Sequence, residues 1–261
     1  MRDALSGKMM GGWAAIAAGA ATVAACWWLT VSMAVDFYHS SATVTMWQNA
    51  SFGILFLMWA VMMAAMMAPA ALPFLRLFWK CGSLQQTSQN TGNSPNSANS
   101  QTITTAAAAA GYALPWLGFS LIAAALHKIA ADSGMLSDNM LLADPHVRAA
   151  LFAAAGIYQL TPLKHACLRG CRPPALFLIL HWKSGVAGAV RTGAHNGLYC
   201  VGCCWALMLL LFAGGVMDLR WIAALALVAV AEKILPITIT AKAIGGGLLF
   251  LAVLPFLSSM S

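Results

Sequence analysis

Residues 52–75 read FGILFLMWAVMMAAMMAPAALPFL and decide the class of fold. The stretch contains no charged side chain, and most of its residues are large and apolar. A bilayer core requires roughly 17–25 apolar residues of helix to cross it. The stretch therefore predicts a membrane-spanning helix.

Six further apolar stretches lie on either side of this segment. They cover residues 11–35, 104–126, 147–163, 195–215, 219–237 and 243–258. Each is expected to be helical, because lipid offers no partner for an unbonded backbone group. We predict an all-α polytopic transmembrane bundle of about seven spans, forming a single membrane domain over residues 1–261. The count falls to six if the short stretch 147–163 is re-entrant or interfacial.

Composition excludes an ordinary soluble protein. Hydrophobic residues make up 61% of the chain and charged residues 8%, whereas soluble domains carry about 25% charged residues. The net charge of +7 does not indicate nucleic-acid binding, because the sequence contains no long basic run. The apolar run from Gly11 to Val35 exceeds the ~7–15 residues of a signal-peptide core, so we expect a retained first span.

The distribution of basic residues predicts the orientation. Cytoplasmic loops of membrane proteins carry an excess of Lys and Arg. With the N-terminus in the cytoplasm, the outer ends of the spans hold only Lys128, Arg148 and Arg220. The inner ends then hold Arg2, Lys8, Arg76, Lys80, Lys164, Arg169, Arg172, Lys183, Arg191, Lys233 and Lys242. We therefore place the N-terminus inside and the C-terminus outside.

Two predicted loops differ in character. Residues 81–103 are rich in Gln, Ser, Asn and Thr, which predicts a flexible polar insertion. Residues 164–194 are basic and contain Cys and His. Within them, the apolar stretch 175–182 is too short to span and is expected to lie at the membrane interface.

Methionines dominate one side of the helix predicted at 52–75. At 100° per residue, the five residues Met58, Met62, Met63, Met66 and Met67 fill half of the helical wheel. Methionine fills gaps in any apolar core. Thioethers also bind soft ions such as Cu(I), and Met62 and Met66 are the candidate ligands. The methionines alone favour the packing interpretation.

A stripe of sulfur atoms marks the helix predicted at 195–215. Cys200, Cys203, Cys204 and Met208 are spaced i, i+3, i+4 and i+8, so they share one helical face. A single Cys would be interpreted as a small packing residue. For three thiols and a thioether together, packing and metal binding have equal weight.

A second pair of thiols precedes this stripe in the basic loop. Cys167 and Cys171 are one helical turn apart, and Pro173 ends the turn. The neighbouring Lys and Arg residues would favour thiolates. His165 lies on the opposite side of that turn and is not an obvious ligand. A basic surface segment with incidental Cys is an equal alternative.

Three polar residues fall within predicted spans. An acid such as Glu232 is costly at membrane depth and by default marks a functional site; the alternative is a structural pair with a loop Lys or Arg. Lys233 is not its natural partner, because adjacent helical residues point about 100° apart. Tyr158 and Gln159 are expected to form hydrogen bonds between helices.

One topology places these groups at a common depth. With the N-terminus inside, the methionines, both Cys groups, Tyr158, Gln159 and Glu232 all lie between mid-membrane and the cytoplasm. Because the cytoplasm is reducing, the cysteines are expected to be thiols or metal ligands rather than disulfides.

Four blocks of this sequence resemble a family of bacterial predicted metal-binding integral membrane proteins, some of which are labelled copper chaperones. The blocks are MWAVMMAAMMAPAALP (58–73), GIYQLTPLKHACLRGCRPP (156–174), HNGLYCVGCCWALMLLLFAGGVMDLRW (195–221) and AEKILP (231–236). Asp218 stands where the family pattern suggests Asn. The resemblance implies metal binding in a bacterial inner membrane.

The leading hypothesis is the binding of a soft metal, Cu(I), in the cytoplasmic half of the bundle, with zinc as the rival metal. Cys200, Cys203 and Cys204 would be the principal ligands, and Cys167 and Cys171 would form an entry or second site. Met62 and Met66 would provide weaker ligands. Glu232 would take up protons or stabilise a nearby Lys or Arg. A protein that donates or accepts the metal is the expected partner.

Two alternatives remain open. Cys200 and Cys203 have the CxxC spacing of a redox pair, but the predicted topology places them on the reducing side. A non-catalytic accessory subunit is the other alternative. Because the sequence shows no nucleotide loop, Ser/His/Asp arrangement or metalloprotease motif, a non-enzyme is expected.

Overall fold

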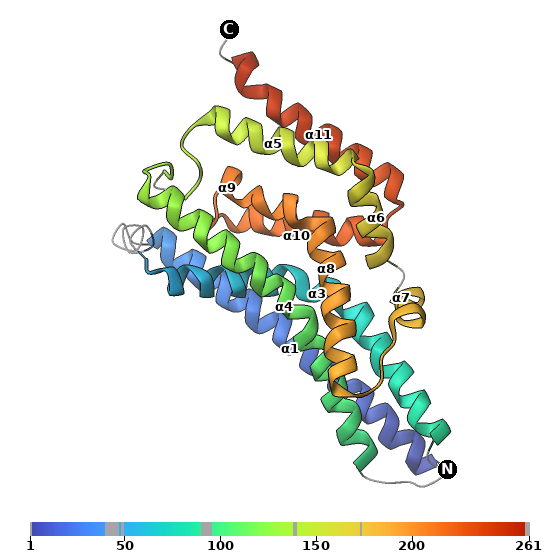
Figure 1. Ribbon diagram of the computed structural model, residues 1–261. Helices are drawn as coiled ribbons and strands as arrows, with labels where there is room; N and C mark the ends of the chain where they lie inside the picture. Colours follow the sequence, from blue (N-terminus) through green and yellow to red (C-terminus); the bar gives the residue numbers. More distant parts are fainter. Residues whose placement is uncertain are drawn as a thin grey trace.

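The computed structural model is built from helices that pack in layers (Figure 1). It describes residues 2–39, 47, 50–89, 96–137, 140–172 and 174–258. Within these ranges, it describes all side chains except those of residues 2–18, 38–39, 83–89, 96–99, 237–238 and 255–258. The all-α prediction is confirmed for the described part of the chain.

Three long helices and the helix α8 form one side of the molecule. The long helices are α1 (Arg2–His39), α3 (Phe52–Gln89) and α4 (Asn96–Asp132), and α8 covers Gly185–Leu209. Figure 1 shows α1 beside α3, and α8 lying along α4. These helices, with the short helix that follows α8, contain four segments that are long and apolar enough to cross a membrane: Gly19–Phe37, Phe52–Gly82, Ser100–Asp132 and Gly185–Gly214.

Shorter helices complete the bundle. Helix α10 (Leu219–Ile234) lies beside the short α9 (Leu211–Gly214). The pair α5 (Pro145–Leu160) and α11 (Ile237–Ser258) lies on the side of α10 that faces away from the long helices (Figure 1). With 16 residues each, α5 and α10 fall just below the usual length of a transmembrane helix. The span count of seven thus stays a prediction.

Local caps explain where the shorter helices begin. The Asp144 carboxylate accepts a hydrogen bond from the His146 amide at the start of α5. Asp218 similarly accepts from the amides of Arg220 and Trp221 at the start of α10. Asp and Asn are comparable N-caps, so Asp218 in place of the expected Asn preserves this function.

Both predicted loops are largely helical. α3 continues to Gln89 and α4 begins at Asn96, so most of the polar stretch 81–103 extends two helices; residues 90–95 lie outside the described part. The basic stretch 164–194 forms α6 (Pro162–Cys171), α7 (Pro174–His181) and the start of α8. Pro162 and Pro174 stand at helix starts, where a proline costs no hydrogen bond.

Small residues bring α4 and α8 into close contact. A Cβ added to Gly193 would lie 2.0 Å from the Ala108 carbonyl oxygen, and one added to Gly197 would lie 2.6 Å from that of Tyr112. The backbones can therefore meet only because both positions are glycine. This contact places Tyr112 of α4 next to the sulfur-bearing face of α8.

The methionine face of α3 is buried, as its pattern predicts. Met58, Met62, Met63, Met66 and Met67 are each at most 3% exposed and belong to the main core. Ala60, Ala64 and Ala68, on the other side of α3, line an apolar crevice of about 300 Å³ between α3, α1 and α4. The alanines thus line a gap rather than a tight helix contact.

Candidate metal centre

The sulfur stripe of α8 points into the centre of the molecule. Cys200, Cys203, Cys204 and Met208 are at most 1% exposed and belong to the same core as the α3 methionines. The Cys203 and Cys204 sulfur atoms lie 3.1 Å apart. The Cys203 thiol also donates to the Cys200 carbonyl at 3.1 Å. The predicted stripe is therefore one buried group of sulfur atoms.

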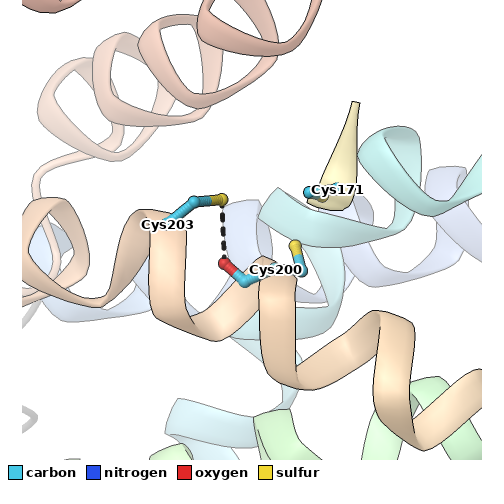
Figure 2. A group of neighbouring side chains, drawn as sticks. All are labelled: Cys171, Cys200 and Cys203. Atoms are coloured by element: carbon cyan, nitrogen blue, oxygen red, sulfur yellow. Dashed lines mark hydrogen bonds between the residues drawn. The ribbon is translucent and has the colours of Figure 1, made fainter. Parts of the chain in front are cut away.

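Helix α6 brings another thiol to this stripe. The sulfur atoms of Cys171, Cys200 and Cys203 all lie within 4.8 Å of one another. Figure 2 shows Cys200 and Cys203 on one helix and Cys171 approaching from a separate segment, the end of α6. With metal–sulfur bonds of about 2.3 Å, three ligands around one ion lie about 4 Å apart. The three thiols can therefore bind one ion after small shifts.

Two glycines allow α6 to reach α8. A Cβ added to Gly170 would lie 2.8 Å from the Tyr199 ring, and one added to Gly202 would lie 2.9 Å from the Cys167 sulfur. Larger residues at either position would separate the two helices. The close approach carries Cys171 to the cluster and leaves Cys167 against the backbone of Gly202.

The two thiols of α6 therefore have different surroundings. Cys171 joins the three-sulfur group, whereas Cys167 does not belong to it. Sequence reasoning assigned both to a separate entry or second site, because an isolated helical turn does not show which residue faces a neighbour. The geometry instead joins Cys171 to the principal cluster.

Two polar groups contact the sulfur of Cys200. The Tyr112 hydroxyl of α4 donates to it at 2.9 Å, and the Lys233 ammonium of α10 donates at 3.0 Å. A cation at this distance stabilises negative charge on sulfur. Sequence reasoning missed both residues. Two features of the sequence could have indicated them: Tyr112 carries a hydroxyl group within an alanine-rich span, and Lys233 is a lysine next to an intramembrane acid.

The end of α6 also contacts the backbone of Lys233. The Arg172 side chain donates from Nε to the Lys233 carbonyl at 2.9 Å.

Cys171, the residue before Arg172, has a raised thiol pKa. A hydrogen bond with Cys200 is the main cause, and the pKa rises to about 11. Without metal, Cys171 thus holds its proton at neutral pH.

Glu232 has a partner from the basic segment. The Lys164 ammonium lies 2.7 Å from both carboxylate oxygens of Glu232, and both side chains are 1% exposed. This confirms the interpretation that Glu232 pairs with a loop Lys or Arg. It also confirms that the adjacent Lys233 is not that partner.

Tyr158 and Gln159 take different positions. The Tyr158 hydroxyl donates to the carbonyl of Gly202, within the sulfur-bearing turn of α8. This interhelical hydrogen bond was predicted. Gln159 is buried beside Gly245 of α11, and among the described residues neither of its amide atoms has a hydrogen-bond partner. For Gln159 the predicted hydrogen bond is therefore not observed.

The remaining candidates lie near the cluster but are not shown to be ligands. Met62, Met66 and Met208 share its core. Cys204 touches Cys203, but two sulfur ligands of one tetrahedral ion are about 3.8 Å apart. One of these two side chains must therefore rotate before both can bind the same ion. The ligand roles of these four residues stay predictions.

The fold and the cluster together define an apolar helical protein with helices long and apolar enough to cross a membrane, and with a largely buried group of thiols that could hold a metal ion. The chain belongs to the family described as PpoB2, copper chaperone, whose model matches residues 56–255. This confirms the resemblance seen in the sequence. No curated protein and no solved structure matches the chain significantly.

Proposed function

We propose that this protein is a membrane copper chaperone that binds Cu(I) at Cys171, Cys200 and Cys203. One observation carries the proposal: three thiols from two helices converge within 4.8 Å in an apolar core. Thiolates are the ligands that Cu(I) prefers. The description of the family as a copper chaperone supports the same metal.

The number of sulfur ligands at the site supports Cu(I) over zinc. Structural zinc sites have four ligands, whereas the cluster has three sulfur atoms within mutual reach and a fourth, Cys204, too close to Cys203. A Cu(I) ion bound by three thiolates carries two negative charges. The ammonium of Lys233 offsets one of them and so lowers the cost of placing the occupied site in apolar surroundings.

We further propose that the protein has seven spans in a bacterial inner membrane, with a cytoplasmic N-terminus. Following the colours of Figure 1, α1, α4, α8 and α11 run in one direction and α3, α5 and α10 in the other. This alternation is what seven consecutive crossings require. The cluster would then lie towards the cytoplasm, where a reducing environment keeps thiols available for metal.

The proposed activity is transfer and not catalysis. A chaperone needs a donor that loads the cluster and an acceptor that removes the ion. Both would be proteins or small carriers that exchange Cu(I) through thiols. The protein itself would remain chemically unchanged.

The direct test measures the metal content of full-length protein purified in detergent from cells grown with copper. We expect one Cu(I) at the cluster, with copper–sulfur scattering in the X-ray absorption spectrum. The triple variant Cys171→Ser, Cys200→Ser and Cys203→Ser should lose it. A matched variant, Cys26→Ser and Cys81→Ser, changes two free thiols outside the three-sulfur group and should retain it.

Two results would contradict the proposal. The first is background copper in the wild-type protein, unaltered by the triple change. The second is a disulfide between Cys200 and Cys203 together with a reporter fusion that places Cys200 outside the cytoplasm. The second result would favour a thiol oxidoreductase.

A further inference from the structure

A pair of histidines lies where α7 ends against α8. The rings of His181 and His195 have centroids 4.5 Å apart and planes 82° apart. His181 ends α7, and His195 lies on α8, five residues before Cys200. Five residues advance a helix by about 7.5 Å. The pair therefore lies close to the sulfur cluster, on the N-terminal side of it along α8.

The surroundings of His181 determine which of its two ring nitrogens can bind a metal ion. Its Nδ1 lies 3.1 Å from the Phe177 carbonyl oxygen. A carbonyl oxygen only accepts, so Nδ1 carries the hydrogen and Nε2 of the neutral ring has the free electron pair. Histidine ligands of metals commonly donate their other nitrogen in this way. The Phe177 ring, stacked at 4.7 Å and 19°, also holds the plane of His181.

The helix ends that carry the two rings are fastened together. The Thr192 hydroxyl donates to the His181 carbonyl at 3.1 Å, which joins the end of α7 to α8. His195 packs against Tyr199 at 5.1 Å, and Tyr199 packs against Gly170 beside Cys171. The histidine pair and the cluster are therefore connected through one aromatic ring.

We propose that His181 and His195 form a second, weaker Cu(I) site that receives the ion before the cysteine cluster. This inference rests on the proposed function of that cluster. Imidazole nitrogen is a suitable copper ligand. Metal–nitrogen bonds of about 2.0–2.1 Å allow two rings at this separation to share one ion. The 82° angle requires one ring to rotate about χ2, a torsion with a broad range.

Nearby charges make this site suited to exchange rather than storage. Lys183 and Arg191 lie close enough to His195 to act on it electrostatically. Their positive charge opposes that of a bound cation. Two neutral ligands near two cations bind Cu(I) less tightly than three thiols beside one ammonium. Metal should consequently move from the histidine pair to the cluster.

The first experiment removes the cluster. In the Cys171→Ser, Cys200→Ser and Cys203→Ser protein, we expect one residual Cu(I) with imidazole scattering in the X-ray absorption spectrum. Replacing His181 and His195 with Phe, which retains both aromatic rings, should abolish this residual copper. His146→Phe, at an exposed histidine of α5, is the matched control and should retain it.

The second experiment keeps the cysteines and follows loading from a Cu(I)–bicinchoninate complex by stopped flow. With one equivalent of copper supplied, loading should be slower in the His181→Phe, His195→Phe variant, while the final Cu(I) content of the cysteine cluster stays unchanged. His195→Gln provides a second variant if the double change reduces the yield of folded protein. In the cluster-free background it should weaken the residual site by at least about tenfold.

The outcomes separate the two proposals. No residual copper in the cluster-free protein, or residual copper that survives the histidine changes, overturns the histidine site. Unchanged loading in the histidine variants overturns its role as the first receiver. If the cluster itself binds no metal, the wild-type spectrum contains no copper–sulfur scattering, whatever the histidine variants show.

Discussion

Two lysines hold their ammonium groups inside the protein, but their partners differ. Lys164 contacts both oxygens of Glu232, so a carboxylate neutralises it. Lys233 contacts the sulfur of Cys200, and among the described residues no carboxylate forms an ion pair with it. α10 supplies Glu232 and Lys233 from adjacent positions, about 100° apart around the helix. One face of α10 thus completes a buried ion pair, while the next face places a positive charge beside the cysteine cluster.

The largest effect is expected at the ion pair. Glu232→Ala leaves Lys164 buried without its counter-charge, which should destabilise the protein by about 3–5 kcal/mol. Thermal unfolding in detergent measures this change. Replacing both residues, as Lys164→Met with Glu232→Leu, should restore much of the loss. A single variant as stable as the wild type would show that the ion pair is not structural.

The metal centre should respond to pH. Binding needs thiolates, and the pKa of Cys171 is raised to about 11, so the ion must displace a proton from a thiol at neutral pH. Cu(I) affinity should thus increase with pH, by about tenfold per unit for each proton released. Competition titrations with a Cu(I) chelator between pH 6 and pH 8 measure the slope. A flat profile would contradict thiol ligation.

Lys233 should affect metal binding more than stability. Lys233→Met removes a hydrogen bond from a charged group, worth about 1.5–3 kcal/mol, or roughly 10–100-fold in Cu(I) affinity. Lys233→Arg keeps the charge and should retain most of the affinity. A Met variant that binds Cu(I) normally but unfolds at a lower temperature would make Lys233 a structural residue like Lys164.

The contact of α6 with α8 should matter for the cluster. Gly202→Ala places a methyl group 2.9 Å from the Cys167 sulfur and should move α6 outward, at a cost of about 1–3 kcal/mol. Copper affinity should decrease because Cys171 moves with α6. Gly118→Ala is the matched control, since its Cβ would meet no atom within 4 Å. Equal behaviour of the two variants would show that this contact does not position the cluster.

The smallest effect is expected at the neutral donor. Tyr112→Phe removes the hydroxyl that donates to Cys200, and a neutral hydrogen bond contributes about 0.5–1.5 kcal/mol. Copper affinity should therefore fall only a few-fold. A loss as large as that of Lys233→Met would indicate that the hydroxyl stabilises the Cys200 thiolate as strongly as the ammonium does.

Much of the fold was accessible from the sequence, and the errors have a common physical origin. Apolar runs located α5 and α10 to within a few residues, but α1 and α11 begin earlier than predicted, and α3, α4 and α8 extend into the polar and basic stretches. Polar composition predicted loops there. A polar helix end can nevertheless satisfy its backbone through its own intrahelical hydrogen bonds, and composition does not reveal this. The stripe of Cys200, Cys203 and Cys204 was equally visible, because helical periodicity alone places those residues on one face.

The sequence by itself determined the apolar class of protein, its helices and the thiols that could bind metal, since composition and periodicity act locally. Only the tertiary structure decided that Cys171, and not Cys167, joins the cluster. It also decided that Lys164 pairs with Glu232, while Tyr112 and Lys233 contact Cys200. These choices depend on how closely α4, α6 and α10 approach α8. That distance is set by contacts at glycines such as Gly193 and Gly202 between segments far apart in the chain.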